Sequence, residues 1–313
     1  MNIKILIILI ILIGLGIGGF FIFKKEFPSE EKETPLGEEI PPSAEKAEEL
    51  NLNWQEDAGT RVSDGSVPYV YKLKDGRYRL YYCGAGGILS AVSPDGLTFQ
   101  KESGVRIAMV FQSGNQESIV CDPTIVELPD GKIRMYYKGS NGSGGPGEAL
   151  HKIFSAISPD GLDFQKEGLR IDSENTGDGG WASVPEAIRL SDGRIRIYYV
   201  SGDFAAGGGI MSAISNDGLN FQKETGARVK GLLLVISLDP RLSPYLPRGI
   251  YSYLSQDGLN FENRKVILQK DGAYDPTIIK IDSESYRIYY GEDIGGQLGQ
   301  PNVVTKSLIG RLK

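Results

Sequence analysis

The chain has 313 residues, a formal net charge of −6, 41 glycines and 16 tyrosines. This length allows one large all-β domain or two smaller ones, and the glycines and tyrosines are typical of aromatic-rich strands joined by many turns. The acidic balance argues against a nucleic-acid-binding surface, and a single histidine, His151, excludes a site built on several histidines.

The N-terminus carries a long apolar run. Residues 5–23 are 19 uncharged residues, preceded by Lys4 and followed by two lysines. As a helix they would span roughly 28 Å, about the thickness of the bilayer hydrocarbon core. Neither a small-residue cleavage site nor a lipid-modified cysteine is evident. We therefore predict that residues 1–25 are a retained membrane anchor, with a cleaved signal peptide as the alternative.

A spacer follows the apolar run. Residues 26–50 are rich in glutamate and proline, which is typical of a solvated linker without a core. The globular part is then residues 51–313. We expect it outside the cytoplasm, because a cytoplasmic location would leave the anchor unexplained.

Two kinds of repeat fill the globular part. In the first, an apolar run ends in Ser-x-Asp-Gly-Leu and a Phe opens the next run, a strong signal for a turn between two strands. Its copies span residues 90–107, 155–171, 212–229 and 252–268. We predict a purely structural role for the turn aspartates Asp95, Asp160, Asp217 and Asp257.

The second repeat pairs an x-Pro run with a Tyr-Tyr run, and both alternate apolar and polar residues as half-buried strands do. Its copies span residues 66–84, 121–139, 183–202 and 274–293. Together the two repeats define a four-stranded unit. Such periodic sheets are typical of a β-propeller.

The ends of the chain complement each other. The last unit lacks a fourth strand, and residues 51–62 match residues 218–229 at six of twelve positions. We therefore predict an all-β, five-bladed propeller that the N-terminal segment closes as the outer strand of the last blade. The fourth blade is expected to be degenerate, because only 15 residues separate Pro240 from Ser255.

The x-Pro strands and Ser-x-Asp-Gly-x-x-Phe turns of residues 51–313 resemble the five-bladed glycoside hydrolases of families 43 and 32. A weaker resemblance links the turns to the Asp-box of sialidases. In families 43 and 32, three inner-strand carboxylates meet in the central funnel: a base or nucleophile, an aspartate that orients the sugar and tunes pKa values, and a glutamate acid.

The resemblance assigns these roles by position. Glu186 takes the acid position on the third blade, and Asp122 takes the orienting position on the second. Val67 stands where the first blade would supply the base, so Asp275 or Asp64 is expected to act instead. An Asp-Pro pair at the start of a strand also caps its own backbone, and this is the alternative role of both Asp-Pro aspartates.

Further residues are expected at the funnel rim. Trp181, Tyr69 and Phe204 would stack on sugar rings, and His151 would bind sugar or help to hold a central ion, as in some family 43 relatives. The alternative is that the aromatic residues simply pack and that His151 is an ordinary hydrogen-bonded strand residue. The sequence indicates no cofactor and no metal ligand set. Cys83 and Cys121 are expected on the same rim of adjacent blades, either bridged or as two free thiols.

Two functions follow from these features. The first is a membrane-anchored, extracytoplasmic glycoside hydrolase that acts on carbohydrate through funnel carboxylates. The second is a non-catalytic propeller that binds glycan or protein at the cell surface, which Val67 at the base position favours. They differ in whether several carboxylates share one funnel.

Overall fold

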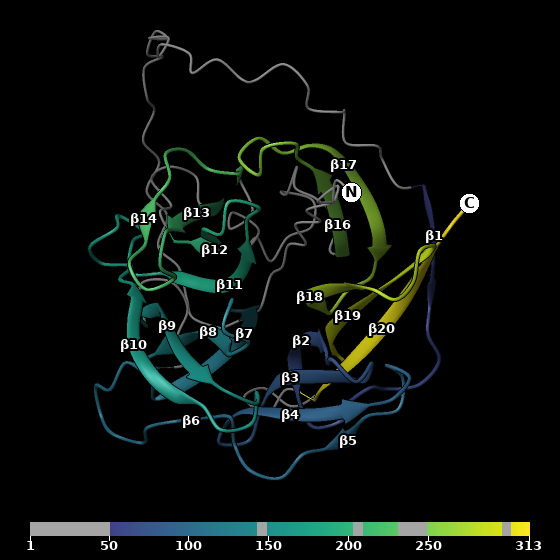
Figure 1. Ribbon diagram of the computed structural model, residues 1–313, viewed down its shortest axis with the longest axis horizontal. Coiled ribbons are helices and arrows are strands. Elements are labelled where there is room, and N and C mark those ends of the chain that lie inside the picture. The colour runs from purple at the N-terminus through teal and green to yellow at the C-terminus, as the bar shows by residue number, and fades with distance from the viewer. Residues whose placement is uncertain (1–50, 143–148, 203–208, 231–248, 296–301) are drawn as a thin grey trace, which may run out of the picture.

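The computed structural model describes residues 51–142, 149–202, 209–230, 249–295 and 302–313. Within these ranges the chain forms twenty strands and no helix. The strands build five sheets around a central axis, so the predicted all-β propeller fold is confirmed (Figure 1).

The first three sheets follow the chain. One contains β2 (Ser66–Lys72), β3 (Tyr78–Gly84), β4 (Gly87–Ser93) and β5 (Gln100–Lys101), and β6 (Ile107–Ala108) also pairs with β4. The next contains β7 (Ile119–Glu127), β8 (Ile133–Ser140), β9 (His151–Ser158) and β10 (Gln165–Ile171). The third contains β11 (Ala182–Arg189), β12 (Ile195–Ser201), β13 (Gly209–Ser215) and β14 (Gln222–Lys223), and β15 (Val229–Lys230) also pairs with β13.

The blade count differs from the prediction. In the described residues four sheets have four or five strands and form complete blades, whereas β16 (Gly249–Leu254) and β17 (Glu262–Gln269) form a two-stranded sheet. This small sheet holds the place of the predicted degenerate fourth blade. The count of complete blades in these ranges is therefore four, because the segment before Ser255 is too short for the usual central strands. Residues 231–248 of that segment lie outside the described residues.

The last blade joins the two ends of the globular part. It contains β18 (Ala273–Lys280), β19 (Ser285–Asp293), β20 (Val303–Leu312) and β1 (Leu52–Glu56). β1 lies antiparallel to β20, with Trp54 opposite Gly310 (Figure 1). The prediction that the N-terminal segment is the outer strand of the last blade is therefore confirmed.

One ion pair shows how closely this segment follows the repeat. In the third blade Arg196 pairs with Glu224 at 2.8 Å, and in the last blade Arg287 pairs with Asp57 at 2.9 Å. Asp57 is the residue that aligns with Glu224 in the sequence match. The N-terminal segment thus supplies side chains as well as backbone to the last blade.

The Asp-Gly turns connect neighbouring blades. A Tyr-Tyr strand donates its first tyrosine hydroxyl to the turn glycine carbonyl of the next blade at 2.8–2.9 Å, in the pairs Tyr81–Gly161, Tyr136–Gly218, Tyr198–Gly258 and Tyr289–Gly96. The turn aspartates accept backbone N–H groups, which lowers the pKa of Asp95 to about 2. These contacts support the structural role predicted for the turns.

Both members of every tyrosine pair are buried, although period-2 alternation places them on opposite faces of the sheet. The physical reason is that each blade packs between two neighbours, so neither face of its sheet reaches solvent. The core is therefore distributed between blades rather than gathered in one centre.

We expect Tyr289→Phe to lower the free energy of unfolding by about 1 kcal/mol, because the buried Gly96 carbonyl would lose its donor. Denaturant unfolding would measure the loss. Tyr286→Phe, on the same strand but only half-buried, is the control. Equal stability of both variants would mean that this contact does not help to close the ring.

The described residues contain no helix long and apolar enough to cross a membrane. The predicted anchor at residues 5–23 and the linker at residues 26–50 lie outside the described residues.

Candidate active site

The four inner strands share one irregularity. β2, β7, β11 and β18 each shift register at their x-Pro step, as in a β-bulge. The residue before each proline has a positive φ, with values of 55° at Val67, 54° at Asp122, 51° at Val184 and 42° at Asp275. Bulges re-aim side chains, and strained backbone of this kind clusters at functional sites.

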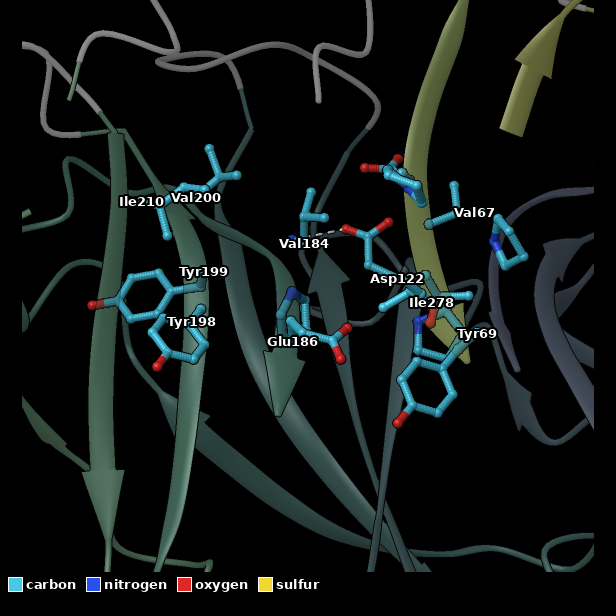
Figure 2. A pocket seen from close by; sticks show the side chains of 16 residues that line it. Val67, Tyr69, Asp122, Val184, Glu186, Tyr198, Tyr199, Val200, Ile210 and Ile278 are labelled. Atoms are coloured by element: carbon cyan, nitrogen blue, oxygen red, sulfur yellow. Dashed lines mark hydrogen bonds between the residues drawn. The ribbon is translucent and has the colours of Figure 1, made fainter. Parts of the chain in front are cut away.

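The bulges surround one pocket at the propeller axis. Its first layer contains the residues before the prolines, and its second layer contains residues that follow the prolines (Figure 2). The first layer is Val67, Asp122, Val184 and Asp275, and the second is Tyr69, Glu186 and Thr277. The predicted carboxylates Glu186, Asp122 and Asp275 and the predicted rim residue Tyr69 therefore share one pocket.

Asp122 is buried and held by three donors on one oxygen. Its Oδ2 accepts the Ser183 hydroxyl at 3.2 Å and the Val184 N–H at 3.1 Å, and it pairs with Lys138 Nζ at 3.1 Å. These contacts fix the position of the Asp122 carboxyl group in the pocket, with Lys138 as its ion-pair partner.

Asp275 has the opposite character. Its Oδ1 is buried without a hydrogen-bond partner among the described residues. Burial raises the pKa of Asp275 well above its ordinary value, and the negative charge of Asp122 raises it further, while Lys138 opposes the shift. When Asp122 is ionised, Asp275 tends to keep its proton.

Glu186 lies deeper in the pocket. Burial is the only cause that raises its pKa, to about 8, so the carboxyl group is mostly protonated at neutral pH. Tyr69 lines the same pocket (Figure 2), and burial raises the pKa of its hydroxyl group. That hydroxyl donates to the Ile125 carbonyl at 3.0 Å, which fixes the ring. The site thus combines one aspartate paired with a lysine and two carboxyl groups whose pKa values are raised.

His151 supports Asp122 from behind the pocket. Its Nδ1 lies 3.1 Å from the Ser183 hydroxyl, and its ring stacks on Trp181 with centroids 3.5 Å apart. Burial, and then the charge of Lys138, lower the pKa of His151 to about 2, so the ring is neutral. His151 and Trp181 pack on each other and are not among the residues that line the pocket.

Two predicted site residues remain, and one of them lies outside the pocket. Asp64 is exposed and pairs with Lys101 on β5, so it does not join the pocket. The repeat has no aspartate at the position of Asp64, and the ion pair with Lys101 keeps the Asp64 side chain at the surface. Phe204 lies outside the described residues.

Sequence reasoning missed three contributors: Lys138, Ser183 and Val200. Lys138 and Val200 each come directly after a Tyr-Tyr pair. On the neighbouring inner strand, Lys138 pairs with Cys121, which precedes Asp122, and Val200 pairs with Ser183, which precedes Val184. The alignment of the repeats could have identified this position. The residue after each tyrosine pair differs from blade to blade, whereas residues that only maintain the repeat stay the same.

Cys83 and Cys121 form a disulfide that joins β3 to β7. Of the two states left open by the sequence, the structure contains the bridge. Cys121 directly precedes Asp122, whose N–H donates to Cys83 Sγ at 3.2 Å. The two sulfurs and the Asp122 carboxylate lie within 4.8 Å of one another, but bonded sulfurs are not thiolate ligands, so these residues do not fit a metal ion.

The fold is that of the glycoside hydrolase propellers. A family 117 glycoside hydrolase of the marine bacterium Zobellia galactanivorans is similar with a TM-score of 0.62 and 17% identity, over 84% of this chain and 92% of that one. A thermostable family 43 glycoside hydrolase is similar with a TM-score of 0.54 and 16% identity, over 82% of this chain and 91% of that one. An alpha-L-arabinofuranosidase from Lactobacillus brevis is similar with a TM-score of 0.56 and 13% identity, over 78% of this chain and 90% of that one.

No family model and no curated protein matches the chain. At these identities the similarity establishes the fold and not the activity. The predicted resemblance to glycoside hydrolase propellers is confirmed at that level.

Proposed function

We propose that the chain is a carbohydrate-active propeller that cleaves glycosides in its central pocket. The observation that carries this proposal is the meeting of Glu186, Asp122 and Asp275 in one pocket, where Asp122 pairs with Lys138 and burial raises the pKa of Glu186 to about 8. Glycoside cleavage needs such a set, because one carboxyl group must donate a proton to the leaving oxygen while others act at the anomeric carbon.

In the proposed mechanism Glu186 is the general acid. Asp122, which three donors hold in place, orients the sugar and keeps the pKa of Asp275 high. Asp275 is the base or nucleophile in its ionised form. Its raised pKa makes it a stronger proton acceptor than an ordinary aspartate.

The second candidate function is a non-catalytic propeller that binds glycan or protein. The observation that favours it is Val67, an apolar side chain at the first-blade position of the base. This function requires the pocket shape but not the proton on Glu186. It therefore predicts binding without turnover.

The proposal includes the setting of the protein. A disulfide persists mainly in oxidising compartments, so the Cys83–Cys121 bridge supports an extracytoplasmic propeller. Residues 5–23 would then be its membrane anchor. We also propose that β16 and β17 are the outer half of a fifth blade, because Tyr198 of the third blade contacts the Gly258 turn as the other blades contact their neighbours.

A panel of 4-nitrophenyl glycosides, assayed across pH, tests the enzymatic proposal. We expect turnover of at least one sugar with a bell-shaped pH profile. One limb is expected near pH 8, where Glu186 titrates, and the other reports the ionisation of Asp275, whose pKa burial and the charge of Asp122 raise. Binding of a sugar without turnover of any glycoside would instead support the second function.

A further inference from the structure

The first layer of the pocket alternates two kinds of side chain. Around the axis it runs Asp275, Val67, Asp122 and Val184, from the strands β18, β2, β7 and β11. A sugar in contact with both aspartates therefore has valines beside it on two sides. Figure 2 shows Val67 and Val184 at the level of Asp122.

The backbone does not explain these valines. At Val67 and Val184 φ is 55° and 51°, a region in which β-branched residues are strained and aspartate is much better tolerated. The other two positions of the layer are indeed aspartates. A valine with a positive φ therefore raises the free energy of the folded backbone, and the local conformation gains nothing in return.

Core packing does not explain them either. Both side chains are only half-buried, and both line the pocket rather than a blade interface. A strained apolar side chain that faces a pocket is best explained by what the pocket holds.

Comparison of the second and third blades strengthens this argument. In the second blade Asp122 pairs with Lys138 at 3.1 Å. The corresponding positions of the third blade are Val184 and Val200, because Ser183 pairs with Val200 as Cys121 pairs with Lys138. Ile210 lies beside Val200 and extends this apolar wall (Figure 2). The same backbone site is charged in one blade and apolar in the next.

We propose that the pocket is selective for a 6-deoxy sugar, which presents a methyl group where a common hexose has a hydroxymethyl group. This inference rests on the proposed function of the pocket and narrows its substrate class. Val67, Val184 and Val200 offer no hydrogen-bond partner, so a hydroxyl group placed against them would lose water without compensation. A methyl group gains by the same burial.

The test uses pairs of glycosides that differ only at this position. They are 4-nitrophenyl β-D-fucopyranoside against the β-D-galactopyranoside, and 4-nitrophenyl α-L-rhamnopyranoside against the α-L-mannopyranoside. We expect kcat/KM to favour the 6-deoxy member of at least one pair by about 10- to 100-fold, the range for a small group in an apolar pocket. Binding of the same four glycosides to Glu186→Gln, measured by saturation-transfer NMR, provides a readout that does not depend on turnover.

Val67→Thr and Val184→Thr keep the size and branching of the side chains but add a hydroxyl group. Because the valines lie on two sides of the sugar and its methyl group faces one of them, we expect at least one variant to reduce the preference several-fold, and both to leave the fold intact. Val266→Thr is the matched control, because Val266 on β17 is 56% exposed and lies outside the pocket.

The outcomes separate the two proposals. Turnover with equal or better use of the hydroxymethyl sugars overturns the 6-deoxy inference and leaves the hydrolase. A 6-deoxy preference in binding without turnover supports the inference and contradicts the hydrolase. A preference that survives both valine variants, or no binding of any of the four glycosides, overturns the inference.

Discussion

Glu186→Gln is expected to lower turnover of any cleaved aryl glycoside by about 10²–10⁴-fold, the usual contribution of a general acid. The amide fills the same space in the pocket but has no acidic proton for the leaving oxygen. Burial keeps that proton on Glu186 up to a pH of about 8. Initial rates near pH 7, with the substrate found by the glycoside panel, measure the effect.

Glu262→Gln is the matched control, because Glu262 is exposed on β17 and does not line the pocket. Unchanged turnover in Glu186→Gln would contradict its role as the acid.

Stability supplies an independent check on Glu186. A carboxyl group whose pKa rises from 4.5 to about 8 on folding stabilises the fold at low pH and loses that effect as pH rises through this window. Glu186→Gln cannot ionise. We therefore expect its stability relative to the wild type to increase between about pH 5 and pH 8. A constant difference would mean that Glu186 is ionised in the folded protein.

The second large effect concerns the disulfide. Replacement of Cys83 and Cys121 by serine is expected to lower the free energy of unfolding by about 4 kcal/mol, the loop-closure value for cysteines separated by 38 residues. The bridge restricts the unfolded chain and ties the first blade to the second. Denaturant unfolding under non-reducing conditions measures the loss.

Reduction provides the control for this prediction. A reducing agent should destabilise the wild type by a similar amount and leave the double variant unchanged. A loss below about 1 kcal/mol in both experiments would show that the blade contacts alone hold this edge of the pocket. Because Cys121 precedes Asp122, we also expect weaker sugar binding in the double variant.

Much of the fold could be predicted because it depends on local chemistry. Asp-Gly turns and alternating strands act within a few residues, so the repeats located most strands before their pairing was known. The match of residues 51–62 to residues 218–229 also identified the closing strand, which forms a long-range contact. The fourth unit was harder, because its repeat is incomplete and the described residues contain only two of its strands.

The site was predicted in part for the same reason. Glu186, Asp122, Asp275 and Tyr69 occupy equivalent steps of a repeated strand, so their meeting at the axis follows from the repeat. Asp64 lies outside that step and was wrongly considered as a pocket residue. His151 was expected at the rim, but its contact with Trp181 draws it behind the pocket.

The sequence by itself determined the all-β propeller fold, the strands of the complete blades and the closing strand, because each depends on residue order within a repeat. The tertiary structure alone decided the surroundings of the pocket carboxyl groups. Lys138 and two further donors hold Asp122, whereas desolvation raises the pKa of Glu186 and of Asp275. These surroundings depend on distances and burial across blades, which no single repeat contains.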